Sequence, residues 1–490
     1  MRAASRATLS GAELADLLGR WSVLDGPLYR LLAERIARLA DTGELPSGVR
    51  LPPERQLAAA ISVSRNTATA AYQLLRDEGL AQTRQGAGTT ISPHRTTPAA
   101  MHRANGFFAG LLESTAVSVD LGVTAVNCAP QVAAALDDPR SVLDAAARRT
   151  LTEGNGYHLY GIDRLRAAIA DRLTLDHRLP TRPEQIFVTT GAQQAIDLLM
   201  RTSVFAGQPV LVEDPTFAGA LDALQRAGGR PVGLPVDEGL DPAELGAALR
   251  VQRPALVYLI LTHQNPTGQV VDALRRQRIA ELAAASPETL FVDDTALAEL
   301  SLTDQAPPTP LAAIAPRLSN VVTIGSVSKT YWAGLRVGWI RAGTELIGRL
   351  AAAKAAVDLG GPALPQAITA ALLTSEHAGI LSWRRAQLRD NLDLLQSGLR
   401  THLPSWSWTR PRGGLSLWVR LAGPTGPCDS GVFSQAALRA GVVVVPDRLL
   451  SATHRRRDRL RIAFSESADR LRAAAPLLAQ AWQQVADLPA

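Results

Sequence analysis

The chain has 490 residues, of which 46% are hydrophobic and 20% charged, so it can form a large core and more than one domain. Its net charge of +6 is modest, no apolar run reaches the roughly 20 residues of a membrane helix, and no apolar signal-peptide core follows the first residues. The two cysteines, Cys128 and Cys428, have no metal-type spacing, which indicates a cytoplasmic protein with reduced thiols and no metal site.

The N-terminal part of the chain predicts a winged helix-turn-helix over residues 25–93, preceded by an extension over residues 1–24. Apolar residues recur at helical spacing, Ser64 is expected to cap one helix, and Gly79 is expected to end it. The expected elements are a helix from residue 28 to about 42, a helix around 57–61, a helix over 65–78, and strands over 80–83 and 89–92.

Five short stretches in this segment form an ordered pattern: PLY at 27–29, RLPPERQLA at 50–58, VSRNT at 63–67, AYQLL at 71–75 and QGAGT at 85–89. Residues 27–91 thereby resemble the DNA-binding domain of the GntR regulator family. A helix that begins at Ser64 would point its N–H groups, Ser64 and Thr67 at DNA, with Arg65 on a guanine edge or a phosphate. The resemblance implies Arg55 as a second base-reading residue, and Gly86 would let the wing approach the minor groove.

The chain changes character after a connecting segment. Residues 94–116 are expected to form a linker, and strands and helices alternate over residues 117–490, which predicts an α/β domain. A turn with polar or glycine residues follows each expected strand, at the position where ligands bind in open α/β sheets. These strands are expected over 186–190, 210–213, 256–261, 290–292 and 321–324.

The placement of lysine marks one of these turns. Only two of the 51 basic residues are lysines, Lys329 and Lys354. Arginine stays protonated, whereas an amine can lose its proton and attack a carbonyl. Because Lys329 lies beside Ser326 and Ser328, with Arg336 downstream, we expect a Schiff base with a phosphorylated aldehyde whose phosphate these side chains hold.

The order and spacing of the turns resemble the type I fold of pyridoxal-phosphate aminotransferases, over roughly residues 118–485. The resemblance implies pyridoxal 5'-phosphate on Lys329, with its ring nitrogen paired to Asp294 or, as second choice, Asp293. Phe217 would stack on the ring, and Asn265 would donate to the ring oxygen. The other implied contacts are Gly191, Ala192, Gln193, Ser326, Ser328 and Arg336 on the phosphate, Arg461 on a substrate carboxylate, and Tyr157 or Tyr160 reaching a phosphate across a dimer interface.

One departure from the aminotransferase pattern concerns catalysis. Leu297 stands where those enzymes usually carry a tyrosine that bonds the ring oxygen, so we expect little or no aminotransferase activity. The two resemblances together identify the chain as a member of the MocR subfamily, whose aminotransferase-like domain senses ligands for a DNA-binding domain. This implies a homodimeric regulator that binds paired DNA half-sites and responds to an amine, an amino acid or the cofactor. The alternatives are a working aminotransferase with a DNA-binding domain, and a repressor whose large domain only dimerises.

Overall fold

The computed structural model describes residues 8–22, 27–41, 43–84, 88–92, 118–152, 155–236, 239–305, 308–424, 426–453 and 457–486. The expected linker over residues 94–116 and the wing residue Gly86 lie outside these residues. Among the helices of the described part, none is long and apolar enough to cross a membrane.

The N-terminal elements form a winged helix-turn-helix with its own core, as the sequence predicted. Tyr72 is buried in this core, and its hydroxyl donates to the Pro52 carbonyl at 2.9 Å. Ser64 caps the fourth helix, because its Oγ accepts from the Thr67 N–H at 3.1 Å. The elements are α1 (Gly11–Leu18), α2 (Leu28–Asp41), α3 (Glu54–Ala60), α4 (Arg65–Asp77), β1 (Ala81–Arg84) and β2 (Gly88–Ile91).

Helix α1 was not expected from the sequence, although its start is readable there. Ser10 and Glu13 form a capping box: each side chain accepts from the other residue's backbone N–H, at 3.2 and 2.9 Å. Leu14 and Leu18 are completely buried in the N-terminal core. Residues 8–22, within the expected extension, are therefore part of this domain's packing.

A seven-stranded sheet organises the large α/β part. Its order is β4-β10-β9-β8-β7-β5-β6, and only β10 runs antiparallel to its neighbours. The five expected strands are confirmed within a few residues at their ends. The strands are β4 (Ile186–Thr189), β5 (Pro209–Asp214), β6 (Arg230–Pro235), β7 (Leu256–Leu259), β8 (Leu290–Asp294), β9 (Val321–Ser326) and β10 (Gly338–Arg341).

Helices cover both faces of this sheet, because strand side chains alternate between two apolar cores. Val257 faces one core with helices α8, α12 and α15, and Tyr258 faces the other with α9 and α14. The helices are α6 (Pro130–Asp137), α7 (Ala145–Thr152), α8 (Asp163–Leu175), α9 (Ala192–Ser203), α10 (Ala218–Arg226), α11 (Pro242–Gln252), α12 (Ala273–Ala284), α13 (Leu311–Ile314), α14 (Thr344–Ala355) and α15 (Ala363–Ser375).

The C-terminal subdomain is a second, smaller α/β unit. It includes β3, the first strand of the large part. Its antiparallel sheet has the order β11-β12-β17-β16, and β3 pairs in parallel with β15. Helices α16 and α18 pack along it. The elements are β3 (Val119–Asp120), α16 (His377–His402), β11 (Ser407–Trp408), β12 (Ser416–Arg420), β13 (Ala422–Gly423), β14 (Gly426–Pro427), α17 (Ser430–Arg439), β15 (Val442–Val443), β16 (Val445–Pro446) and β17 (Arg459–Ala463) with α18 (Ala468–Gln483).

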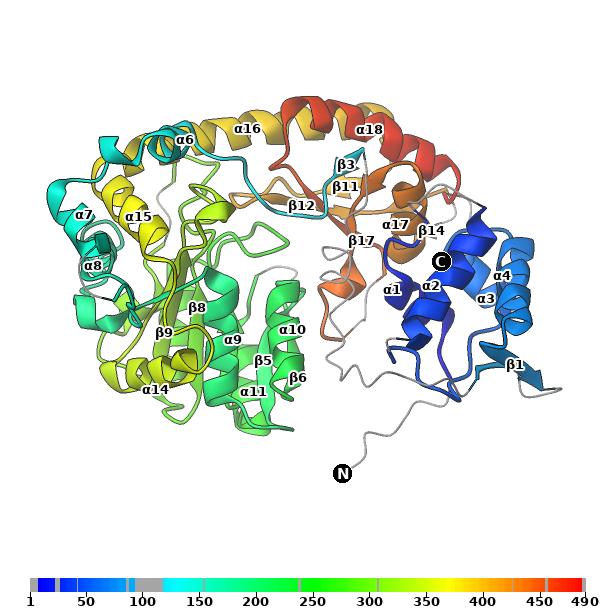
Figure 1. The fold of residues 1–490 in the computed structure, drawn as a ribbon, viewed down its shortest axis with the longest axis horizontal. Coiled ribbons are helices and arrows are strands. Elements are labelled where there is room, and N and C mark those ends of the chain that lie inside the picture. Colours follow the sequence, from blue (N-terminus) through cyan, green and yellow to red (C-terminus); the bar gives the residue numbers. More distant parts are fainter. Residues whose placement is uncertain are drawn as a thin grey trace.

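Within the described residues, the N-terminal domain packs against the C-terminal subdomain. Figure 1 shows the blue helices α1–α4 beside α17, with the green and yellow sheet on the far side. Helix α3 contacts α17, the Arg439 guanidinium donates to the Ile61 carbonyl at 2.7 Å, and Ser62 Oγ donates to the Val432 carbonyl at 3.2 Å. These two hydrogen bonds join the turn between α3 and α4 to α17 of the large part.

Candidate functional site

A cavity lies where the carboxyl ends of the large sheet's strands meet the C-terminal subdomain. Its empty volume is about 750 Å³. The carboxyl ends of β4, β5, β7, β8 and β9 contribute to it, so residues far apart in sequence converge there. The lining residues are Thr124, Ala192, Gln193, Phe217, Ile260, Asn265, Asp294, Ala296, Leu297, Ser326, Ser328, Lys329, Arg336, Leu415 and Ser416.

Lys329 projects into this cavity from the turn after β9. Its Nζ donates to the Thr124 carbonyl at 2.7 Å. The pKa of Lys329 is lowered to about 8, chiefly by burial and also by the positive charges of Arg461 and Arg336, and the Asp294 carboxylate opposes this decrease. A larger fraction of this amine is therefore neutral near pH 8 than for an exposed lysine, which suits attack on a carbonyl.

The second lysine has a structural role. Lys354 is buried at the end of α14, and its Nζ pairs with the Asp358 carboxylate. Asp358 also accepts from Gln194 Nε2 at 2.9 Å, so the buried charge is neutralised within a bonded network. Of the two lysines, Lys329 is the one that lines the cavity described above.

One end of the cavity is suited to an anion. Gly191 has φ +96° and is the N-cap of α9, and a Cβ there would lie 3.2 Å from the Arg336 guanidinium. The hydroxyls of Ser326 and Ser328 are 3.0 Å apart at the same end. Arg336 donates to the Thr190 carbonyl, which holds its guanidinium beside the helix N-terminus. Helix N–H groups, two hydroxyls and a guanidinium are the donors that a phosphate needs.

A buried carboxylate closes the other end. Asp294 Oδ2 accepts from the Tyr258 hydroxyl at 2.6 Å, and Oδ1 accepts from the Ala296 N–H at 3.0 Å. Burial raises the pKa of Asp294, and these two bonds oppose the rise by favouring its charged form. Such a carboxylate is suited to pairing with a protonated ring nitrogen.

The neighbouring acid faces away from the cavity. Adjacent residues of a strand point to opposite faces, and Asp293 accepts from the Leu311 N–H at 3.0 Å on the α13 side. The sequence had left the choice between Asp293 and Asp294 open. The geometry brings only Asp294 to the cavity. Tyr258 was not foreseen as a site residue, because it lies within an apolar strand.

Arg461 is buried at the side of the cavity where the C-terminal subdomain meets it. It is 0% exposed, lies on the inner strand β17, and donates to Asn265 Oδ1 at 3.3 Å and to the Gly122 carbonyl at 2.5 Å. Asn265 lines the cavity, so its amide links the two residues. A guanidinium placed here can receive a ligand carboxylate, provided that it gives up one of these bonds.

The remaining residues divide into those that reach the cavity and those that do not. Phe217 lines the cavity just before α10. Leu297 also lines it, and its aliphatic side chain stands where aminotransferases usually carry a tyrosine hydroxyl. Tyr157 and Tyr160 are 64% and 41% exposed and do not line it. Any contribution of these tyrosines would have to come from a second copy of the chain.

The expected DNA-reading side chains lie on the surface of the N-terminal domain. Arg55 on α3 and Arg65 at the start of α4 are exposed, and Ser64 beside Arg65 is exposed as well. The Ser64 hydroxyl already serves as the helix cap and lies 2.9 Å from the Thr67 hydroxyl. Arg55 and Arg65 are therefore freer to contact DNA than the two hydroxyls.

Comparisons with known proteins agree with both halves of the chain. Residues 125–476 match the family model "Aminotransferase class I and II", and residues 28–91 match "Bacterial regulatory proteins, gntR family". The HTH-type pyridoxine biosynthesis transcriptional regulator PdxR of Corynebacterium glutamicum is 30% identical, over 73% of this chain and 75% of its own. The Probable rhizopine catabolism regulatory protein MocR of Rhizobium meliloti is 28% identical, over 64% and 65%.

A solved structure shares the fold of the large part. The alpha-aminoadipate aminotransferase LysN of Thermus thermophilus, in complex with N-(5'-phosphopyridoxyl)-L-leucine, superposes with a TM-score of 0.66. It is 27% identical and covers 78% of this chain and 95% of its own. The predicted fold class, a winged helix-turn-helix followed by an aminotransferase-type α/β part, is thereby confirmed.

Proposed function

Because this chain belongs to the class I and II aminotransferase family and fuses that domain to a gntR-type DNA-binding domain, as MocR-type regulators do, we propose that it is a ligand-responsive transcription regulator. It would act in the cytoplasm as a homodimer on paired DNA half-sites. The single observation that carries the proposal is the coexistence of a helix-turn-helix with exposed Arg55 and Arg65 and a cavity that presents Lys329.

We propose that the cavity holds pyridoxal 5'-phosphate. When bound, this cofactor supplies an aldehyde and an electron-withdrawing ring. The Gly191 cradle, Arg336 and the two serines fit its phosphate, and Asp294 fits its ring nitrogen. Lys329 would attach it covalently, Phe217 would cover one face of the ring, Gln193 would adjoin the phosphate end, and Ala192 would contribute its N–H.

The residues of the chain would act mainly by binding and orienting. Asn265 would donate to the ring oxygen, and Arg461 would receive the carboxylate of an amino-acid effector. Leu297 supplies no hydroxyl at the ring oxygen, which favours sensing over turnover. Tyr157 or Tyr160 would reach a partner subunit's phosphate site, for which their exposure is suitable.

A working aminotransferase remains the second proposal, because Lys329 and Asn265 line one cavity and Arg461 donates to Asn265, a set with the chemistry that amino transfer requires. Sustained consumption of an amino acid with 2-oxoglutarate would favour it. Failure across a broad panel of amine donors would favour the regulator.

The test has two independent parts. Borohydride reduction followed by mass spectrometry should find a cofactor adduct on Lys329 in the wild type, and Lys329→Ala should lack both the adduct and the visible absorbance. Titration onto the protein's own upstream DNA should then give an affinity or a footprint that changes with cofactor and amino acid. If neither changes, the large domain does not regulate DNA binding.

A further inference from the structure

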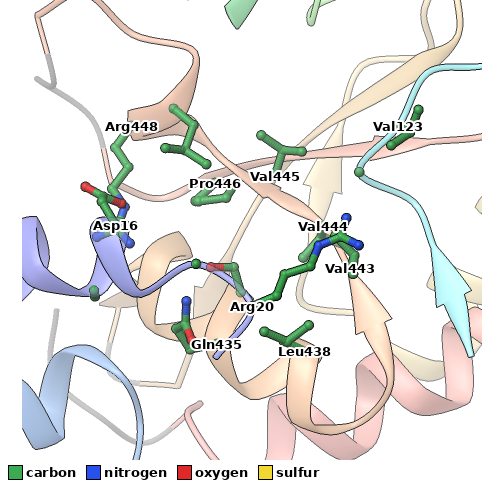
Figure 2. Close-up of a pocket in the computed structure, with 15 residues that line it drawn as sticks. Asp16, Arg20, Val123, Gln435, Leu438, Val443, Val444, Val445, Pro446 and Arg448 are labelled. Carbon is green, nitrogen blue, oxygen red and sulfur yellow. The ribbon is translucent and has the colours of Figure 1, made fainter. Parts of the chain in front are cut away.

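A small cavity separates the N-terminal domain from the C-terminal subdomain, and two ion pairs border it. Figure 2 shows Asp16 beside Arg448, and Arg20 extending from the end of α1 toward Val444. Asp16 Oδ1 lies 2.5 Å from Arg448 Nε, and Arg20 Nη2 lies 2.8 Å from Asp120 Oδ2. The second pair joins the DNA-binding domain to β3, the strand that leads toward the cofactor cavity.

Asp120 is bonded on both sides. Its Oδ2 accepts from Arg20, and its Oδ1 accepts from the Gly122 N–H at 2.8 Å. The Gly122 carbonyl in turn accepts from Arg461 Nη2 at 2.5 Å. The turn has no spare room, because a Cβ on Gly122 would come within 2.9 Å of Val443. Arg20, Asp120, Gly122 and Arg461 thus form a continuous series of direct contacts.

The charges in this series depend on one another. Burial lowers the pKa of Arg461 to about 10, and the Asp120 carboxylate opposes that decrease. The side chains of Arg20 and Asp120 are only 13% and 22% exposed, so water screens their attraction less than that of a surface pair. The Asp120 carboxylate therefore stabilises the positive charges of Arg20 in the N-terminal domain and of Arg461 in the large part.

We propose that Asp120 is a positioning residue that links the carboxylate-binding state of Arg461 to the docking of the DNA-binding domain. A ligand carboxylate that bonds Arg461 competes with the Gly122 carbonyl, loosens the turn over residues 120–122 and weakens the Arg20 ion pair. This series of contacts responds only to effectors that carry a carboxylate. An amine without a carboxylate does not weaken the Arg20 ion pair. The regulatory consequence of the series rests on the proposed function, whereas the contacts themselves exist without ligand.

The test measures amide hydrogen exchange by mass spectrometry on the full chain. Arg461→Gln should raise exchange about fivefold both in residues 118–123 and in α1, as expected when a partly buried pair is lost. The control is Arg336→Gln, which changes an arginine that lines the cavity and has no contact with the turn over residues 120–122, and it should leave α1 unchanged. An increase confined to residues 118–123, or an equal increase in α1 in both variants, would overturn the proposal.

Because Arg461 is buried, its variant could fail to fold, and a reciprocal variant covers that case. Arg20→Gln should raise exchange in residues 118–123 from the opposite end. Its matched control is Arg472→Gln, which breaks an exposed pair with Asp469 on α18. Exchange in residues 118–123 that matches the wild type in Arg20→Gln would refute the link.

A ligand comparison then tests the selectivity for carboxylates. L-leucine and isoamylamine share a side chain, and each is added until the absorbance of the bound cofactor stops changing. L-leucine should raise exchange in α1 of the wild type, isoamylamine should not, and Arg20→Gln should respond to neither. Equal responses to both ligands would overturn the proposal. A missing absorbance change counts against the proposed function alone, and the ligand-free variants then decide whether the contact series couples the domains.

Discussion

Replacing Tyr258 by phenylalanine removes a single hydroxyl beside the cofactor cavity and barely alters the packing of the core. That hydroxyl donates to Asp294 at 2.6 Å in a fully buried setting, and the Ala296 N–H at 3.0 Å is the other donor. A hydrogen bond to a charged group contributes about 1.5–3 kcal/mol. At about 1.4 kcal/mol per pKa unit, the pKa of Asp294 should rise by about 1–2 units.

The expected consequence is weaker cofactor binding. A protonated Asp294 cannot neutralise a positively charged ring nitrogen, so the affinity for pyridoxal phosphate should fall by about 10- to 100-fold. The sign of the pH dependence follows from the raised pKa. The carboxylate persists above its pKa and is lost as pH falls, so the defect of Tyr258→Phe should grow toward lower pH and shrink toward higher pH.

The assay is a titration of apo protein with cofactor, followed by absorbance at several pH values. Tyr72→Phe is the matched control, because it also removes a buried tyrosine hydroxyl, one that bonds a neutral carbonyl in the N-terminal domain. An affinity of Tyr258→Phe within about twofold of the wild type at every pH, or an equal loss in Tyr72→Phe, would refute the reasoning.

Three further results are expected. Arg65→Ala should weaken specific DNA binding by about 1–3 kcal/mol and relax sequence preference, whereas Arg76→Ala, at the other end of α4, should not; an equal loss on all sequences would make Arg65 a phosphate contact. The rate of cofactor attachment should rise as Lys329 loses its proton and level off above pH 8 or so, since only the neutral amine attacks; a flat profile contradicts this. Leu297→Tyr should raise amino transfer from an L-amino acid to 2-oxoglutarate, and unchanged rates would show that the missing hydroxyl is not limiting.

The local signals in the sequence were sufficient for the elements and the fold class. Periodic leucines, the Ser64 cap and the glycine turns predicted the helices and strands of the N-terminal domain, because these effects act over a few residues. The alternation of apolar strands with polar turns predicted where a ligand cavity would open, since parallel strands place their carboxyl ends at one edge. The same local reasoning could have found α1 from its Ser10–Glu13 capping box.

Only the tertiary structure shows the contacts between residues that are far apart in the sequence, because no local sequence pattern predicts which of them meet. The choice of Asp294 over Asp293 depends on which face of β8 meets the cavity, and the support from Tyr258 comes from the neighbouring strand β7. The bond from Arg461 to Gly122 spans most of the large domain's sequence, and the Arg20–Asp120 pair crosses from one domain to the other. Such pairs form because packing brings distant segments together, and their energies depend on burial, which the order of residues along the chain does not by itself specify.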